Sequence, residues 1–146
     1  MASILLIENQ AIVRDAIRHF LFPQHDVVPI GQTPSPEDLR DCNLVIIDTE
    51  TLRALNQSRE TVETILAGAN VPALWMCPAG ASLPESHARS IFVAKPLDAE
   101  VFRSAVEELV AARIEAESTE ESHTDAERVI ELTEVIEEGS PDEETN

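Results

Sequence analysis

The only lysine of the 146 residues, Lys95, stands directly before Pro96 at the end of an apolar run. An ammonium is a compact, rotatable charge, and it suits a carboxylate or a small oxyanion better than the fixed fork of an arginine. Three other apolar runs also end in a reactive residue: Glu8, Asp48 and Cys77. Two carboxylates, an ammonium and a thiol are therefore candidates for one site, the alternative being that Lys95 is a surface lysine left by chance.

These runs predict the elements that would position the four residues. Apolar runs of four residues without alternation are typical of strands buried on both faces of a parallel sheet. A fifth candidate strand contains Pro29, which cannot donate to a central ladder and therefore belongs at a sheet edge. The five expected strands are 4–7, 27–30, 44–47, 73–76 and 91–94.

Helical patterns lie between the expected strands. Over 11–21, an apolar face that includes Ile12 and Ile17 ends before Pro23. A patchier stripe runs from 51 to 67 and stops at Gly68. After Lys95, Asp98 can cap a helix whose apolar residues follow helical spacing: Phe102, Ala105, Val106, Leu109 and Val110.

The alternation of strands and helices predicts an α/β fold. We expect a flavodoxin-like five-stranded parallel sheet in the order 2-1-3-4-5 with flanking helices, because this order puts the strand with Pro29 at an edge. Ligands of such sheets bind beyond the carboxyl ends of the strands. Glu8, Asp48, Cys77 and Lys95 would gather there.

Four segments in this order and spacing, 4–9, 44–48, 71–77 and 92–96, resemble the receiver domain of bacterial response regulators over residues 3–113. The resemblance implies that Asp48 accepts a phosphoryl group from a histidine kinase or a small phosphodonor and that Lys95 pairs with it. It places Cys77 at the switch position usually held by serine or threonine, and Phe92 at the aromatic switch position.

The resemblance also implies a magnesium site at Glu8, Asn9, Asp48 and the backbone carbonyl of Glu50. Mg²⁺ prefers oxygen ligands, and it would neutralise the charge that develops in phosphoryl transfer. Asn9 stands where the family has a second acid, so one charge at contact distance is missing and we expect weak or absent binding. The thiol of Cys77 is likewise a weak hydrogen-bond donor in place of a hydroxyl.

Two stretches leave little room for helices of the family. Residues 31–42 contain Pro34 and Pro36, and residues 78–90 contain Pro78, Gly80 and Pro84. We therefore expect shortened second and fourth helices. The surface that receivers commonly use for partners would then differ here.

Simpler interpretations remain for single residues. Asp48 could cap a turn after its strand, and Cys77 could be a small buried apolar residue. A hydrolase with Asp48 as nucleophile is a different class of function. It is suggested by a faint likeness of Asp48-Thr49-Glu50 to the paired acids of haloacid-dehalogenase-type phosphatases. Those enzymes place the pair after the first strand, so we expect no enzyme.

Charge divides the chain into a receiver-like domain, 1–114, and an acidic tail, 115–146. The first part holds 15 acids and nine bases, a net charge of −6, and the tail holds 13 acids and one base, a net charge of −12. Such charge disfavours nucleic-acid binding. Two cysteines without a framework, no basic leader and no membrane-length apolar run favour a cytoplasmic protein without membrane contact.

The tail contains an amphipathic segment near 125–138, which we expect to be a short helix in an otherwise disordered setting. A capping-box pattern at 124–127 precedes it, and Gly139 ends it. Its aliphatic residues would bind a protein partner or dock on the domain; the alternative is a solvated tail that aids solubility. The candidate contact residues are Val129, Leu132, Val135 and Ile136.

Together these patterns predict a stand-alone atypical receiver in phosphorelay signal transduction, with its output through protein contacts. The alternative is a phosphorylation-independent pseudo-receiver that serves as an interaction or scaffold module.

Overall fold

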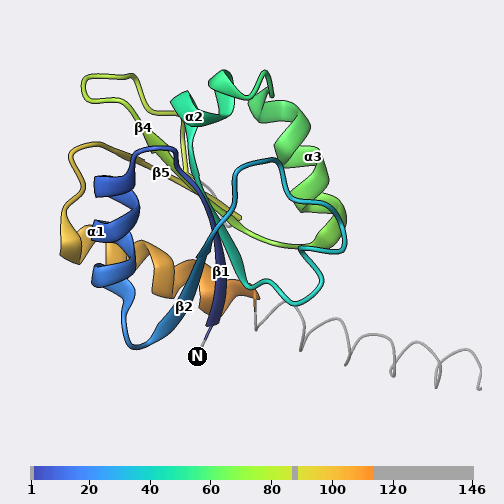
Figure 1. The fold of residues 1–146 in the computed structure, drawn as a ribbon, viewed down its shortest axis with the longest axis horizontal. Coiled ribbons are helices and arrows are strands. Elements are labelled where there is room, and N and C mark those ends of the chain that lie inside the picture. Colours follow the sequence, from blue (N-terminus) through green and yellow to red (C-terminus); the bar gives the residue numbers. More distant parts are fainter. Residues whose placement is uncertain (1, 87–88, 114–146) are drawn as a thin grey trace, which may run out of the picture. The chain divides into compact units, whose positions relative to one another are not determined.

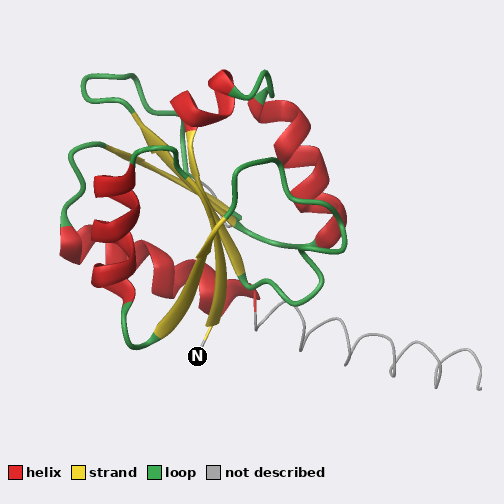
Figure 2. Cartoon of the chain, viewed as in Figure 1, coloured by secondary structure: helices red, strands yellow, loops and turns green. Residues whose placement is uncertain are grey.

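The computed structural model describes residues 2–86 and 89–113, which form a five-stranded parallel sheet in the order β2-β1-β3-β4-β5 (Figures 1 and 2). The predicted strand order is confirmed, and β2, which carries Pro29, lies at an edge. The strands are β1 (Ala2–Ile7), β2 (His25–Pro29), β3 (Leu44–Asp48), β4 (Ala73–Cys77) and β5 (Ser90–Ala94).

Helices cover both faces of this sheet. The helices are α1 (Ala11–Leu21), α2 (Thr49–Ala54), α3 (Arg59–Ala69) and one over 99–113. Figure 1 shows α1 and the helix over 99–113, in blue and orange, on one side of the sheet and α3, in green, on the other. Each crossover returns the chain to the same end of the sheet, so the carboxyl ends of all five parallel strands lie side by side at the opposite end.

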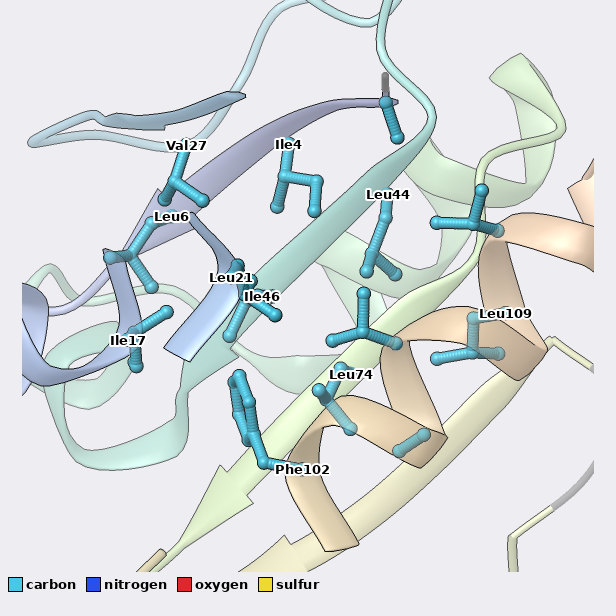
Figure 3. Close-up of a cluster of buried hydrophobic side chains, with 14 of the residues drawn as sticks. Ile4, Leu6, Ile17, Leu21, Val27, Leu44, Ile46, Leu74, Phe102 and Leu109 are labelled. Carbon is cyan, nitrogen blue, oxygen red and sulfur yellow. The ribbon is translucent and has the colours of Figure 1, made fainter. Parts of the chain in front are cut away.

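Two hydrophobic clusters fill the space between sheet and helices. In the first, Ile4, Leu6 and Ile46 of the sheet pack with Ile17 of α1 and Phe102 of the helix over 99–113 (Figure 3). In the second, alternate residues of the same strands pack against α3. Because both faces are covered, β3 and β4 are buried at every position, which explains the apolar runs 44–47 and 73–77.

The predicted first and last helices are confirmed. The first has the bounds expected from the sequence, and Asp98 caps the last, its Oδ1 accepting hydrogen bonds from the backbone N–H groups of Glu100 and Val101, both at 3.0 Å. The apolar face assigned to α1 was partly wrong. Ile12 is 80% exposed, whereas Val13 of the same turn packs against the core and Ile17 is fully buried.

The prediction of one helix between 51 and 67 was also wrong, since two helices, α2 and α3, occupy this stretch. Asn56 has a positive φ of 60°, which ends α2, and Ser58 caps α3 by accepting a hydrogen bond from the N–H of Thr61 at 3.1 Å. Gly68 does not stop α3. The helix continues to Ala69 and ends at Asn70, which has the left-handed conformation.

The stretches expected to hold shortened helices are reduced further. Residues 36–41 form hydrogen-bonded turns that bury Leu39, and residues 78–86 contain no helix. The prolines in both stretches limit helix formation. Among residues 2–86 and 89–113, no helix is long and apolar enough to cross a membrane.

Candidate functional site

Three charged side chains meet at the end of the sheet where the strands finish. Glu8 follows β1, Asp48 ends β3 and Lys95 follows β5. The backbone N–H of Lys95 donates to the carbonyl of Cys77 at 2.9 Å, which extends the pairing of β4 with β5 as far as the lysine. The parallel register therefore sets the position from which the long lysine side chain reaches the two acids.

Lys95 bridges both carboxylates. Its Nζ lies 2.9 Å from Oε1 of Glu8 and 3.0 Å from Oδ1 of Asp48. The lysine side chain keeps 22% of its exposure, whereas those of Glu8 and Asp48 keep 0% and 5%. Burial opposes the lysine charge, but the hydrogen bonds to Glu8 and Asp48 outweigh it and raise the pKa of Lys95 above its ordinary value. The ammonium is therefore held charged between two acids.

The second oxygen of Asp48 is also occupied. Oδ2 accepts hydrogen bonds from the backbone N–H of Thr51 at 2.9 Å and from its Oγ1 at 2.7 Å. Asp48 is thereby the N-cap of α2, as the capping interpretation of this residue expected. The Oγ1 of Thr51 also accepts from the backbone N–H of Asn9 at 3.1 Å, so Thr51 connects α2 to the loop after β1.

Glu8 is fixed by local hydrogen bonds as well. Its Oε2 accepts from the backbone N–H of Gln10 at 3.0 Å, and its backbone carbonyl accepts from a guanidinium N–H of Arg14 at 3.1 Å. Both oxygens of this buried carboxylate therefore have partners. Hydrogen bonds therefore fix both the side chain and the backbone carbonyl of Glu8.

This arrangement does not fit a magnesium ion. All four carboxylate oxygens of Glu8 and Asp48 are engaged, and the described residues contain no group of three His, Cys, Asp or Glu side chains that could hold a metal. Asn9 is exposed at the rim. Glu50 lies in the first turn of α2, where helix geometry points its carbonyl along the helix and away from Asp48. A cation would need Oδ2 of Asp48 to leave Thr51.

The two switch positions are buried beside the site. Cys77 is buried, and burial raises the pKa of its thiol despite the opposing charge of Arg59. Phe92 stacks on Trp75 with ring centroids 6.0 Å apart, and the guanidinium carbon of Arg59 lies 5.5 Å from the centre of its ring. The backbone N–H of Phe92 donates to Oγ of Ser86 at 3.1 Å. These contacts hold the aromatic ring inside.

The ion pairs of Glu8, Asp48 and Lys95 form a charge network. A pocket of about 540 Å³ opens next to this network, between α1, the end of β2 and α2. Glu8, Asn9 and Thr51 line it together with Arg14 and residues further out, whereas Asp48 does not. Thr51 therefore stands between the pocket and the Asp48 carboxylate. A reagent that approaches from this side meets Thr51 first.

The structure thus unites Glu8, Asp48 and Lys95, places Cys77 close by, and leaves Glu50 within a helix. The candidate contact residues of the tail, Val129, Leu132, Val135 and Ile136, lie outside the described residues, and their role stays a prediction. Sequence reasoning missed Thr51, whose spacing three residues after Asp48 is a capping signal, and it also missed Arg14 and Arg59, whose contacts have no local signal.

Solved structures similar to this chain include receiver domains of response regulators. The chain is similar to a response regulator receiver modulated diguanylate cyclase from Pelobacter carbinolicus, with 19% identity and a TM-score of 0.57 over 81% of this chain and 99% of that one. It is similar to a response regulator receiver protein from Sinorhizobium medicae, with 21% identity and a TM-score of 0.56 over 77% and 96%.

The N-terminal domain of the nisin resistance regulator NsrR, a lantibiotic response regulator, gives 12% identity and a TM-score of 0.59 over 75% of this chain and 98% of that one. No protein family model and no curated protein matches the sequence. The chain therefore has the fold of a response regulator receiver domain, and the predicted fold class is confirmed.

Proposed function

We propose that this chain is an atypical receiver of a phosphorelay and that Asp48 is its phosphoacceptor. The observation that supports the proposal best is the bridge from Lys95 to Glu8 and Asp48, at 2.9 and 3.0 Å, at the sheet edge where this fold binds ligands. A histidine kinase or a small phosphodonor would supply the phosphoryl group. The output would be a changed contact with a protein partner.

The reaction places heavy electrostatic demands on the site. A carboxylate oxygen of Asp48 attacks the phosphorus, the bond from phosphorus to the donor breaks, and the donor leaves with that electron pair as an acyl phosphate forms. Two anions must approach, so a fixed positive charge at the acceptor lowers the barrier. Lys95 supplies that charge, and Glu8 holds the ammonium in place. Because the residues present do not fit magnesium in this arrangement, no step here depends on it.

A second function is supported by the contacts of Asp48. Both of its oxygens have partners and the residue is 3% exposed, which leaves the nucleophile with little access to a donor. In this alternative the chain is a pseudo-receiver. The charge network then only holds the strand ends together, and the protein binds its partner without modification.

Mass spectrometry separates the two functions. We expect acetyl phosphate to add one phosphoryl group to the full chain with or without added Mg²⁺, and beryllofluoride to shift the NMR signals around Asp48. Asp48→Asn should abolish both effects, and Asp26→Asn, which removes an exposed carboxylate on β2, should preserve them. If the wild-type chain gives neither an adduct with acetyl phosphate nor a shift with beryllofluoride, the pseudo-receiver is the function that remains.

We also propose that the aliphatic segment of the tail binds a protein partner. Deletion of residues 119–146 should abolish the contact and leave the circular dichroism of the domain unchanged. A matched variant with serine at Val129, Leu132, Val135 and Ile136 keeps the length and charge of the tail. Partner binding that survives in both variants would exclude this segment.

A further inference from the structure

Helix α2 is short and depends on Asp48 at its start. It contains six residues, Thr49–Ala54, fewer than an isolated helix needs for stability in water. Its N-terminal cap is the Asp48 carboxylate, through two hydrogen bonds from Thr51 to a single oxygen. At its other end the backbone turns away at Asn56, so α3 does not extend it. The start of α2 is therefore the point where its stability is decided.

Thr51 connects Asp48 to two elements at once. Its hydroxyl donates to Oδ2 of Asp48 at 2.7 Å and accepts from the N–H of Asn9 at 3.1 Å. Thr51 and Leu52 are buried, while Glu50 and Arg53 are exposed. Asp48 is thus joined through a buried threonine to a helix whose outer face meets solvent.

The two switch positions, Cys77 and Phe92, are less suited than Thr51 to pass on a change at Asp48. Phe92 is held by Trp75, Arg59 and Ser86, and Cys77 offers a thiol in place of a hydroxyl. Residues 78–86, which follow Cys77, contain no helix that could move as a unit. Of the described helices, α2 is the one whose N-cap is Asp48 itself.

We propose that Thr51 is a positioning residue that couples the state of the Asp48 carboxylate to α2, so that the exposed face of α2 is the surface that changes when Asp48 is modified. The inference rests on the proposed function, since it specifies how modification of Asp48 is transmitted. A carboxylate is a stronger acceptor for N–H and O–H groups than the carbonyl oxygen of an acyl phosphate. Modification therefore weakens the cap and loosens the first turn of α2.

Amide hydrogen exchange measured by NMR on the full chain tests the coupling. Thr51→Val keeps the shape of the side chain and removes its hydroxyl, so the amides of 49–54 should exchange roughly fivefold faster, as expected for loss of a capping hydrogen bond. Thr51→Ser keeps the hydroxyl and should exchange like the wild type. Ser58→Ala, the matched control, removes the cap of α3 and should accelerate α3 while leaving α2 unchanged.

Each outcome decides the inference. Equal exchange of α2 in Thr51→Val and the wild type would refute the coupling, and so would a Thr51→Ser variant as fast as Thr51→Val, because the hydroxyl would then not be the cause. A beryllofluoride adduct at Asp48 that leaves α2 exchange unchanged would refute it as well. If no adduct forms, the phosphoacceptor function fails, and the comparison of the variants alone decides whether Thr51 couples Asp48 to α2.

Discussion

Replacement of Lys95 by methionine is the sharpest test of the charge network. Methionine has a similar length and fills the same space without charge, so the variant leaves Glu8 and Asp48 as two buried carboxylates without their shared cation. At an effective dielectric constant of about 20, each contact near 3 Å corresponds to about 5–6 kcal/mol of Coulomb attraction. The cost of desolvating the three charges offsets most of this attraction.

The net effect is therefore smaller than the Coulomb sum. Removal of one partner from a buried ion pair costs about 3–5 kcal/mol, and we expect the low end, about 3 kcal/mol, because water still screens the partly exposed ammonium. Urea denaturation followed by circular dichroism measures this loss. In the Lys95→Met background, Glu8→Gln removes one of the two unpaired carboxylates and should restore about 1–2 kcal/mol.

The double-mutant cycle also supplies the refuting result. If the loss of unfolding free energy in the double variant equals the sum of the losses in the two single variants, Glu8 and Lys95 are not coupled. The network described above then does not stabilise the fold. A loss below about 1 kcal/mol for Lys95→Met would likewise mean that the bridge behaves as an ordinary surface ion pair.

Three further predictions follow from the same contacts. Because the folded-state pKa of Lys95 is raised above 10.5, its stabilisation is present in full below about pH 10.5 and is lost as the pH rises through the folded pKa, so urea midpoints should fall at alkaline pH less steeply in Lys95→Met. Burial raises the pKa of both thiols, Cys42 and Cys77, so at pH 7.5 they should react slowly with a disulfide reagent and rapidly in denaturant; fast reaction of the native chain would contradict this. Phe92→Ala should cost about 3–5 kcal/mol in urea denaturation, whereas Arg59→Ala should cost only about 0.5–1 kcal/mol, and equal losses would show that ring burial is not what holds Phe92.

The strands and their order were predictable because burial on both faces leaves a simple sequence signal. β3 and β4 are apolar at nearly every position, and Pro29 marks an edge strand. The meeting of Glu8, Asp48 and Lys95 followed from topology alone, since parallel strands bring their carboxyl ends to one edge. Contacts between residues 87 positions apart, such as Lys95 with Glu8, were thus predictable to the level of a shared site.

Details that depend on hydrogen-bonding side chains and loop conformation were not predictable in the same way. The break between α2 and α3 depends on the left-handed Asn56 and the cap at Ser58, in a stretch whose apolar spacing also suits one continuous helix. The two partners of Asp48 depend on atomic distances that no spacing fixes. The sequence indicates that Asp48 can cap a turn or serve a site, and the structure shows Oδ2 capping α2 and Oδ1 paired with Lys95.

Burying the charges of this network costs desolvation free energy, so strand-end stability is not a sufficient explanation for it. Glu8 and Asp48 lose nearly all their exposure, and apolar residues of similar volume often stabilise a fold as well as a buried ion pair does. Stability alone therefore gives no reason to keep three charges at the edge where this fold binds ligands. Phosphoryl transfer to a carboxylate does give one, because it needs a fixed cation at the acceptor. In that proposal Oδ1, which faces Lys95, is the reacting oxygen, because both hydrogen bonds of Thr51 hold Oδ2 as the cap of α2.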